Sequence, residues 1–282
     1  MIHFDYQKKL EIIRTSGFMF EVHLTEHCNL NCKGCSHFSP LAHEEFMEID
    51  VFEKDMARMA QLFGGNTIWR INLLGGEPLL HPQVNDFMKI AANCFPDIQI
   101  QLTTNGILLP SMNNAFWETC RATRTLIHIS RYPVRVAFSA LERKAQAEGV
   151  EIVVYPRHTA KIFRKDVYDL TGMQDARQSH SVCELFGYCC QLNRGKFYPC
   201  TISAYFHHLN RFFNLGIPLS SDNFVDIYNA QSKDEFIRLI TAPVPCCNYC
   251  NMNARKWGVK WERSKRRLEE WTVGFDHEKQ IK

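Results

Sequence analysis

Strand-like apolar runs alternate with helix-like segments through the first 155 residues of this 282-residue chain. The predicted strands are residues 18–24, 69–74, 98–103, 125–130 and 151–155. The predicted helices are a short segment at 1–16 and residues 50–63, 82–94, 111–121 and 134–148. Strands that alternate with helices form a parallel sheet with right-handed crossovers. The pattern therefore predicts an α/β fold, a partial (β/α) barrel of the TIM type that is open on one side.

Polar motifs follow the ends of these strands. Three cysteines come after the first strand, a Gly-Gly-Glu-Pro segment after the second, Asn105 after the third, and Ser130 ends the fourth. Active sites of β/α barrels lie beyond the carboxyl ends of the strands. These positions predict one shared pocket.

The first cysteine group is Cys28, Cys32 and Cys35. Three thiolates on one short loop can hold three irons of a [4Fe–4S] cluster and leave the fourth iron open to a small molecule. With His27 or His37 they could instead form a tetrahedral zinc site. Zinc sites usually pair their ligands in two knuckles, and this loop has one Cys-x2-Cys pair, so the spacing favours iron and sulfur.

The Cys-x3-Cys-x2-Cys loop followed by Gly75-Gly76-Glu77-Pro78 resembles the radical S-adenosylmethionine (SAM) enzymes. The resemblance implies that SAM binds the open iron and is cleaved to a 5′-deoxyadenosyl radical that abstracts hydrogen from the substrate. It also implies that the Gly-Gly-Glu-Pro segment binds the amino group of SAM. The glycines let backbone carbonyls approach a ligand closely, and Glu77 can accept a hydrogen bond from an ammonium group.

The same resemblance suggests further SAM contacts at the strand ends. Thr104 or Asn105 matches the position after the third strand, and Ser130 and Arg131 match that after the fourth loosely. A turn pair at Asn105 or a satisfied hydroxyl at Ser130 is the structural alternative. The residue before the third cysteine is often aromatic in the family, but here it is Gly34. Phe38 is the candidate to replace that aromatic contact with adenine.

A second cysteine group occupies residues 183–250: Cys183, Cys189, Cys190, Cys200, Cys246, Cys247 and Cys250. Residues 189–200 predict a β-hairpin, and residues 232–241 predict a helix with a capping box. Together they resemble the twitch domain, a shortened SPASM domain of radical SAM enzymes, which implies one auxiliary [4Fe–4S] cluster. The ligand set that matches best is Cys183, Cys200, Cys247 and Cys250.

Other cysteines remain open as alternatives. Cys246 competes with Cys247 for one ligand position. Cys189 and Cys190 alternate along a strand, so at most one of them faces the cluster. Cys94 and Cys120 are expected to be buried thiols that pack as small hydrophobes.

The predicted domains are the barrel at residues 1–180, the twitch/SPASM-like domain at 181–252 and a basic C-terminal helix at 253–282. In that helix Trp257, Trp261 and Leu268 would form one apolar stripe. Its cations are expected to face solvent.

Composition narrows the functional classes. A net charge of +3 gives no argument for nucleic acid. The chain has neither an apolar run long enough for a transmembrane helix nor a signal peptide at its N-terminus. Without a secretion signal, the twelve cysteines indicate metal binding rather than disulfides. A cytoplasmic location in a reducing environment is expected.

A fully ligated auxiliary cluster suits one-electron oxidation of a substrate radical. The chain's size and cysteine layout resemble the 2-deoxy-scyllo-inosamine dehydrogenases, which oxidise a secondary alcohol to a ketone. We therefore predict a radical SAM oxidoreductase that acts on a small polar sugar or aminocyclitol, with a flavodoxin- or ferredoxin-type electron donor. Arg131, Arg157 and His158 are candidates by position for the catalytic base. The alternatives are a radical enzyme that modifies peptides or proteins and a non-enzymatic metal-binding protein.

Overall fold

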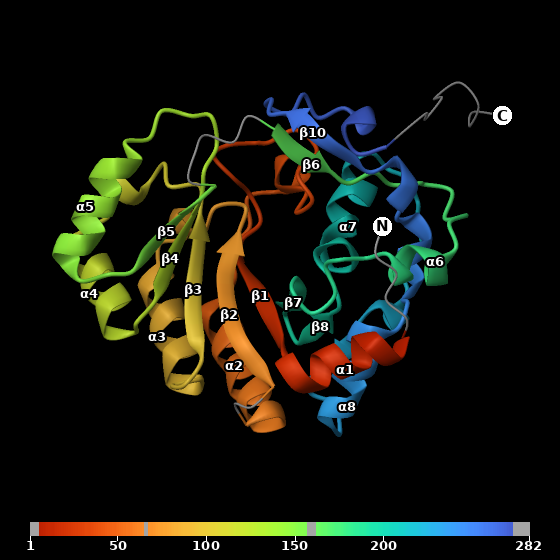
Figure 1. Ribbon diagram of the computed structural model, residues 1–282, viewed down its shortest axis with the longest axis horizontal. Coiled ribbons are helices and arrows are strands. Elements are labelled where there is room, and N and C mark those ends of the chain that lie inside the picture. The colour runs from red at the N-terminus through yellow and green to blue at the C-terminus, as the bar shows by residue number, and fades with distance from the viewer. Residues whose placement is uncertain (1–5, 65–66, 157–161, 273–282) are drawn as a thin grey trace.

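The computed structural model describes residues 6–64, 67–156 and 162–272. Its main sheet has eight strands in the order β5-β4-β3-β2-β1-β7-β8-β9. The five strands of the barrel half pair in parallel; they are β1 (Phe18–Thr25), β2 (Ile68–Gly75), β3 (Gln99–Thr104), β4 (Leu126–Ser130) and β5 (Ile152–Tyr155). Figure 1 shows these strands side by side, with their carboxyl ends at the same edge.

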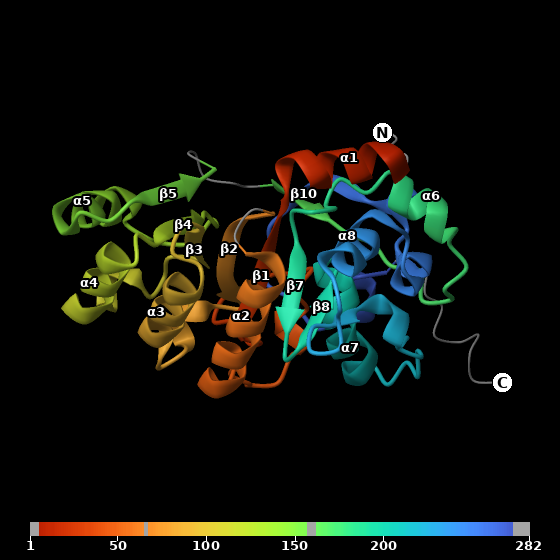
Figure 2. The same cartoon turned by 90° about the horizontal axis from the view of Figure 1, so that it is seen from below.

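Helices cover one face of this sheet, as Figure 2 shows for α3 and α4 beneath β3 and β4. The helices of the barrel half are α1 (Tyr6–Ser16), α2 (Ile49–Phe63), α3 (Val84–Cys94), α4 (Asn114–Ala122) and α5 (Phe138–Glu148). Alternate residues of β1, such as Phe18, Phe20 and Val22, are buried in the core between sheet and helices. This alternation leaves the remaining residues of each strand on the opposite, concave face. The predicted α/β partial barrel is confirmed, with element boundaries close to those expected from the sequence.

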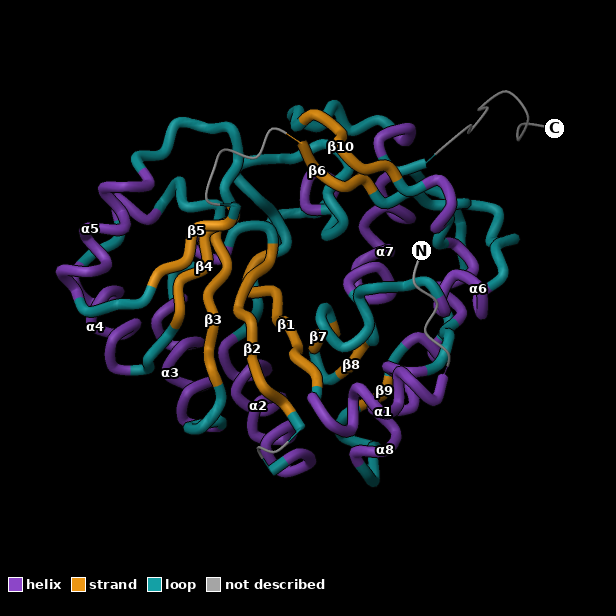
Figure 3. Tube along the Cα trace, viewed as in Figure 1, coloured by secondary structure: helices purple, strands orange, loops and turns teal. Residues whose placement is uncertain are grey.

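The C-terminal half extends the same sheet. Its strands and helices are α6 (Ala176–Ser181), β7 (Cys190–Asn193), β8 (Lys196–Tyr198), α7 (Thr201–Phe212), β9 (Val225–Asp226) and α8 (Lys233–Thr241). Strand β7 pairs in parallel with β1, whereas β8 runs antiparallel to β7. The predicted hairpin is therefore present but is continuous with the barrel sheet. Figure 3 shows α6, α7 and α8 gathered on the side of the sheet beyond β1.

Local sequence explains the hairpin and the last long helix. Arg194 and Gly195, at the hairpin turn, both have positive φ, 48° and 76°, which matches the right-handed twist of the flanking strands. Helix α8 begins at the predicted capping box of Ser232 and Glu235. Helix α7 was not expected from the sequence. It carries the centre of a second apolar core that includes Tyr205.

The predicted basic helix over residues 253–282 is wrong within the part of it that is described. Residues Lys256–Lys260 form strand β10, which pairs antiparallel with β6 (Ile162–Lys165). Gly258 and Arg266 have left-handed φ values of 71° and 54°, which an α-helix does not accommodate. Trp257 is exposed and Leu268 is buried, so the expected stripe does not face one surface. Residues 273–282 lie outside the described residues.

The β6–β10 pair lies at the same end of the molecule as the carboxyl ends of the parallel strands (Figure 1). Across the described ranges, no helix is both long enough and apolar enough to cross a membrane.

Candidate active site

The Gly-Gly-Glu-Pro segment packs directly on the backbone that leads into the first cysteine loop. The Gly76 amide donates to the carbonyl of Thr25 at 2.8 Å, and the Glu77 amide donates to the carbonyl of His27 at 3.1 Å. A Cβ on Gly75 would lie 2.2 Å from the Thr25 carbonyl oxygen, and one on Gly76 would lie 2.0 Å from that of His27. No residue with a Cβ fits there, so the two glycines fix the ends of β1 and β2 against each other.

Glu77 connects this segment to the end of β3. Its buried carboxylate accepts hydrogen bonds from the Leu79 amide at 3.2 Å, the Thr104 hydroxyl at 2.6 Å and the Asn105 amide at 2.9 Å. Burial raises the pKa of Glu77 to about 7, and these hydrogen bonds oppose the shift. Both carboxylate oxygens thus already accept protein donors. Binding of an ammonium group by the Gly-Gly-Glu-Pro segment stays a prediction.

The predicted residues at the ends of strands three and four lie in different environments. The side-chain amide of Asn105 donates to Asn29 Oδ1 at 2.7 Å and lies 3.8 Å from Cys28 Sγ, so the end of β3 reaches the cysteine loop. The guanidinium of Arg131 lies 4.4 Å from the centre of the Phe138 ring. Ser130 ends β4 and is partly buried. The candidates Arg157 and His158 lie outside the described residues.

The three loop cysteines are free thiols that receive N–H donors. The Leu30 amide donates to Cys28 Sγ at 3.4 Å, and Trp261 Nε1 donates to Cys32 Sγ at 3.2 Å. Burial and then the neighbouring charge of Cys35 raise the pKa of Cys32 to about 12, and burial raises that of Cys28 to about 11. Thiolates held this close repel one another until a cation binds them. Hydrogen bonds to sulfur are also a feature of iron–sulfur sites.

In the described part of the chain, no three His, Cys, Asp or Glu side chains are placed to hold one metal ion. The thiolates of a [4Fe–4S] cluster instead each bind a different iron. The loop therefore fits the cluster in ligand type, ligand number and surrounding donors.

The C-terminal segment covers this loop, which the sequence did not predict. The Lys33 amide donates to the Glu262 carbonyl at 2.9 Å, and the Ser264 amide donates to that of Asn31 at 2.8 Å. Trp271 Nε1 donates to the Cys35 carbonyl at 2.9 Å. These partners are more than 220 residues apart in sequence, as the separation of 236 for the Trp271 contact illustrates. No local pattern could have paired them.

Phe38 does not offer its ring to a ligand. The residue is fully buried, and its ring packs against Tyr168, Phe206 and Trp271 with centroid distances of 5.5, 6.1 and 6.4 Å. The expected contact between Phe38 and adenine is therefore wrong. The aromatic residues that do adjoin the cysteines include Tyr132, Phe163 and Trp261, which line a pocket together with Cys32 and Cys35.

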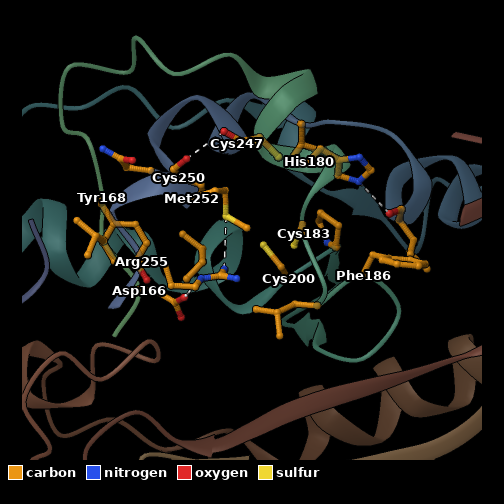
Figure 4. Close-up of a pocket in the computed structure, with 18 of the residues that line it drawn as sticks. Asp166, Tyr168, His180, Cys183, Phe186, Cys200, Cys247, Cys250, Met252 and Arg255 are labelled. Carbon is orange, nitrogen blue, oxygen red and sulfur yellow. Dashed lines mark hydrogen bonds and ion pairs between the residues drawn. The ribbon is translucent and has the colours of Figure 1, made fainter. Parts of the chain in front are cut away.

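A separate cavity gathers the four cysteines of the expected auxiliary set. Figure 4 shows Cys183, Cys200, Cys247 and Cys250 around it, and all four line its wall. Cys200 lies at the N-terminus of α7, while Cys247 and Cys250 come from the turn after α8. Burial, followed by the charge of Cys200, raises the pKa of Cys247 to about 12. Four thiols on one cavity match the ligand number of a fully ligated cluster.

The competing cysteines do not line this cavity. Cys246 is buried in the second apolar core, and its amide donates to Asn223 Oδ1 at 2.8 Å. Cys190 is fully buried in the barrel core. Cys189 points its thiol at the Leu185 carbonyl, 3.3 Å away.

A row of polar side chains crosses the concave face of the sheet. Gln191, Glu21, Asn72 and Gln101 occupy directly paired positions on β7, β1, β2 and β3. Gln191 and Asn72 donate to the two carboxylate oxygens of Glu21 at 2.5 and 2.9 Å, and Gln101 donates to Asn72 Oδ1 at 3.4 Å. Burial raises the pKa of Glu21 to about 7. The alternation of β1 could have revealed Glu21 and His23 as inward-facing polar residues.

A buried histidine network lies beside this row. His23 and His208 both contact Glu26 Oε2 at 3.0 Å, and His23 Nε2 lies 2.7 Å from His37 Nδ1. Tyr205 of α7 stacks on His23 with ring centres 3.6 Å apart. Burial alone would raise the pKa of Glu26, but the two histidines hold it well below its usual range. The network joins the first cysteine loop to α7.

We expect the Gly76→Ala variant to lose SAM cleavage. Its methyl group would collide with the His27 carbonyl and displace the cysteine loop, and displacements of about 1 Å can cost about 100-fold in rate. The measurement is the rate of 5′-deoxyadenosine formation, together with iron content. Gly64→Ala is the control: it adds the backbone strain of a left-handed φ of 55°, but nothing lies within 4 Å of an added Cβ there. Equal rates in both variants would contradict the fit described above.

Comparisons with known proteins agree with this geometry. A family model described as the radical SAM superfamily matches residues 22–130. The chain is 33% identical over 104 residues to GTP 3′,8-cyclase of Nautilia profundicola; this match covers 37% of this chain and 30% of the relative. It is 32% identical over 116 residues to GTP 3′,8-cyclase of Pelotomaculum thermopropionicum; this match covers 40% of this chain and 32% of the relative. The chain thus spans about a third of the length of the curated relatives it matches.

Among solved structures, BtrN in complex with AdoMet and 2-DOIA has a similar fold, with a TM-score of 0.50 and 16% identity. That similarity covers 83% of this chain and 93% of BtrN. It therefore includes both the barrel half and the C-terminal half.

Proposed function

Because the chain belongs to the radical SAM superfamily of enzymes, we propose that it uses SAM to oxidise a small polar substrate by two electrons. Cys28, Cys32 and Cys35 would hold a [4Fe–4S] cluster, which when bound would leave one iron open to SAM and would supply the electron that cleaves SAM to methionine and a 5′-deoxyadenosyl radical. Around it, Leu30 and Trp261 direct N–H donors at the cysteine sulfurs.

The observation that carries the oxidative part of the proposal is the cavity with four cysteines. Cys183, Cys200, Cys247 and Cys250 would hold an auxiliary [4Fe–4S] cluster, which when bound can accept one electron without binding substrate. Full ligation by four thiolates leaves no iron open. A non-enzymatic metal site would need neither this arrangement nor the glycine-lined contact at the first loop.

The polar row on the concave face supports a substrate rich in hydroxyl or amino groups. Gln191 Oε1 and Gln101 Oε1 are buried and lack hydrogen-bond partners among the described residues. Buried polar atoms normally find partners, so a polar ligand over this face would satisfy them. With a pKa of about 7, Glu21 can exchange a proton near neutral pH. It is therefore a better candidate for the proton acceptor than Arg131, whose guanidinium packs on a phenylalanine ring.

We propose a sugar or an aminocyclitol as the substrate class and a secondary alcohol as the group oxidised. The support is the polar row together with the likeness of fold to BtrN, whose crystals contain 2-DOIA. A flavodoxin- or ferredoxin-type protein would supply the electron that starts each cycle.

Anaerobic reconstitution tests the proposal. We expect about eight irons per chain, because two [4Fe–4S] clusters would be present, and 5′-deoxyadenosine on addition of dithionite and SAM. About four irons would remove the case for oxidation. Zinc without SAM cleavage would overturn the whole proposal.

The substrate is tested with a panel of aminocyclitols, sugar alcohols and short peptides. We expect one of the polyhydroxylated compounds to yield a ketone and 5′-deoxyadenosine in equal amounts. A modified peptide in place of a ketone would show that the enzyme is a peptide modifier.

A further inference from the structure

Lys9 is a fully buried lysine in α1, with 0% of its surface exposed. Its neighbour Lys8 is exposed. Lysine is almost never fully buried unless its charge is paired, and an isolated buried ammonium is costly. The surroundings of Lys9 must therefore explain why its charge lies inside the protein.

The contacts of Lys9 place it directly behind two residues that line the cavity with four cysteines. Its Nζ donates to the His180 carbonyl at 2.5 Å and lies 3.3 Å from His180 Nδ1. It also lies 4.6 Å from the centre of the Phe186 ring. Both His180 and Phe186 line that cavity (Figure 4).

No carboxylate supplies the missing negative charge: among residues 6–64, 67–156 and 162–272, no ion pair involves Lys9. Burial lowers the pKa of Lys9 to about 8, and the neighbouring Cys183 and Cys247 oppose that shift. Both cysteines belong to the auxiliary set. Within the described ranges, the cation is thus buried near the cysteines and forms no ion pair with an acidic side chain.

We infer that Lys9 is the electrostatic partner of the auxiliary cluster and raises its reduction potential. This inference rests on the proposed binding of that cluster by Cys183, Cys200, Cys247 and Cys250. Four thiolates make the cluster site anionic, and reduction adds one more negative charge. A nearby cation stabilises the reduced state more than the oxidised state, and burial removes most of the screening by water. Net charge is one of the factors that set cluster potentials.

The inference gives α1 a role that the barrel sequence does not suggest. The helix would tune the auxiliary cluster toward accepting an electron. Lys9 would act on the reduction potential of the cluster and would not touch the substrate, so it is not a catalytic residue.

The test is a redox titration of the auxiliary cluster, monitored by electron paramagnetic resonance. The full-length chain carries Cys28→Ala, Cys32→Ala and Cys35→Ala, so that only the auxiliary cluster contributes. In that background we expect Lys9→Met to lower the equilibrium constant for reduction at least about tenfold, a shift of about 59 mV for one electron. Lys9→Arg keeps the charge and is expected to titrate close to the parent. Lys8→Met, on the same helix, is the control and should cause no shift.

An unchanged potential in Lys9→Met would overturn the inference. If Lys9→Met fails to retain the cluster, Lys9→Arg decides. If Lys9→Arg retains the cluster, the charge of Lys9 has the inferred role. If both variants lose the cluster, the inference is overturned, and Lys9 serves the packing of the site instead. If the parent variant itself binds no cluster, the proposed auxiliary site fails first. That outcome differs from the one in which the cluster is bound but its reduction potential is the same with and without the Lys9→Met substitution.

Discussion

Replacing Cys28, Cys32 and Cys35 together by alanine is expected to reduce 5′-deoxyadenosine formation to the level without enzyme. The three thiolates are the proposed cluster ligands, and among residues 6–64, 67–156 and 162–272 no cysteine from outside the loop lines the neighbouring pocket. The second cysteine group should be unaffected, so about four irons per chain should remain after reconstitution. The measurements are product formation with dithionite and SAM, and the iron and sulfide content of the same samples.

Cys94→Ser is the matched control for this variant. Cys94 is a partly buried free thiol at the end of α3, in contact with the barrel core rather than with either cysteine site. It should retain both SAM cleavage and the full iron content. SAM cleavage that survives in the triple variant would refute the assignment of the loop as a cluster site.

Cys247→Ser is expected to lower the iron content from about eight to about four per chain, whereas Cys246→Ser should leave it unchanged. The two cysteines are adjacent, but only Cys247 lines the cavity of the auxiliary set. The thiol of Cys246 packs in the second apolar core instead. Iron content and the visible absorption spectrum report the difference directly.

The same pair separates the two parts of the proposed reaction. Cys247→Ser should still form 5′-deoxyadenosine, because the first loop is intact, but it should not complete the oxidation of substrate. Loss of iron from Cys246→Ser with retention in Cys247→Ser would reverse the ligand assignment. Loss from both variants would indicate that the turn as a whole, and not one thiol, holds the site.

The sequence predicted the barrel half closely because each of its elements is determined locally. Apolar alternation in residues 18–24 marks β1 whatever lies beside it, and the capping box at Ser232 specifies where α8 begins. The motifs after the strands were also located correctly, since parallel strands carry their carboxyl ends to one edge. Sequence alone could likewise propose that the Gly-Gly-Glu-Pro segment adjoins the cysteine loop.

The roles of single side chains within those motifs were less predictable. The sequence proposed Glu77 as an acceptor for an ammonium group but could not show that its carboxylate also accepts hydrogen bonds from Thr104 and Asn105. Phe38 looked like an adenine contact, yet it is packed inside the second core. In both cases the deciding partners come from other parts of the chain. A motif specifies where the backbone of a residue lies but not which side chains or backbone groups that residue contacts.

The C-terminal segment shows the same limit most clearly. Trp257, Trp261 and Leu268 have spacings that fit a helix, but residues Lys256–Lys260 form a strand because β6 offers them an edge to pair with. Trp261 then donates its indole N–H to Cys32, 229 residues away in sequence. Pairing with a distant strand outweighs the weak local preference of such a short segment.

The sequence by itself thus determined the alternating α/β framework, the cysteine loop at the end of β1 and the two groups of cysteines. These follow from periodicity and spacing, which act over a few residues. Only the tertiary structure decided that Cys247 rather than Cys246 lines the cavity, that the C-terminal segment covers the first loop, and that Lys9 is buried beside the second site. The physical reason is that burial and charge depend on which segments pack together, and those contacts join residues far apart in the chain.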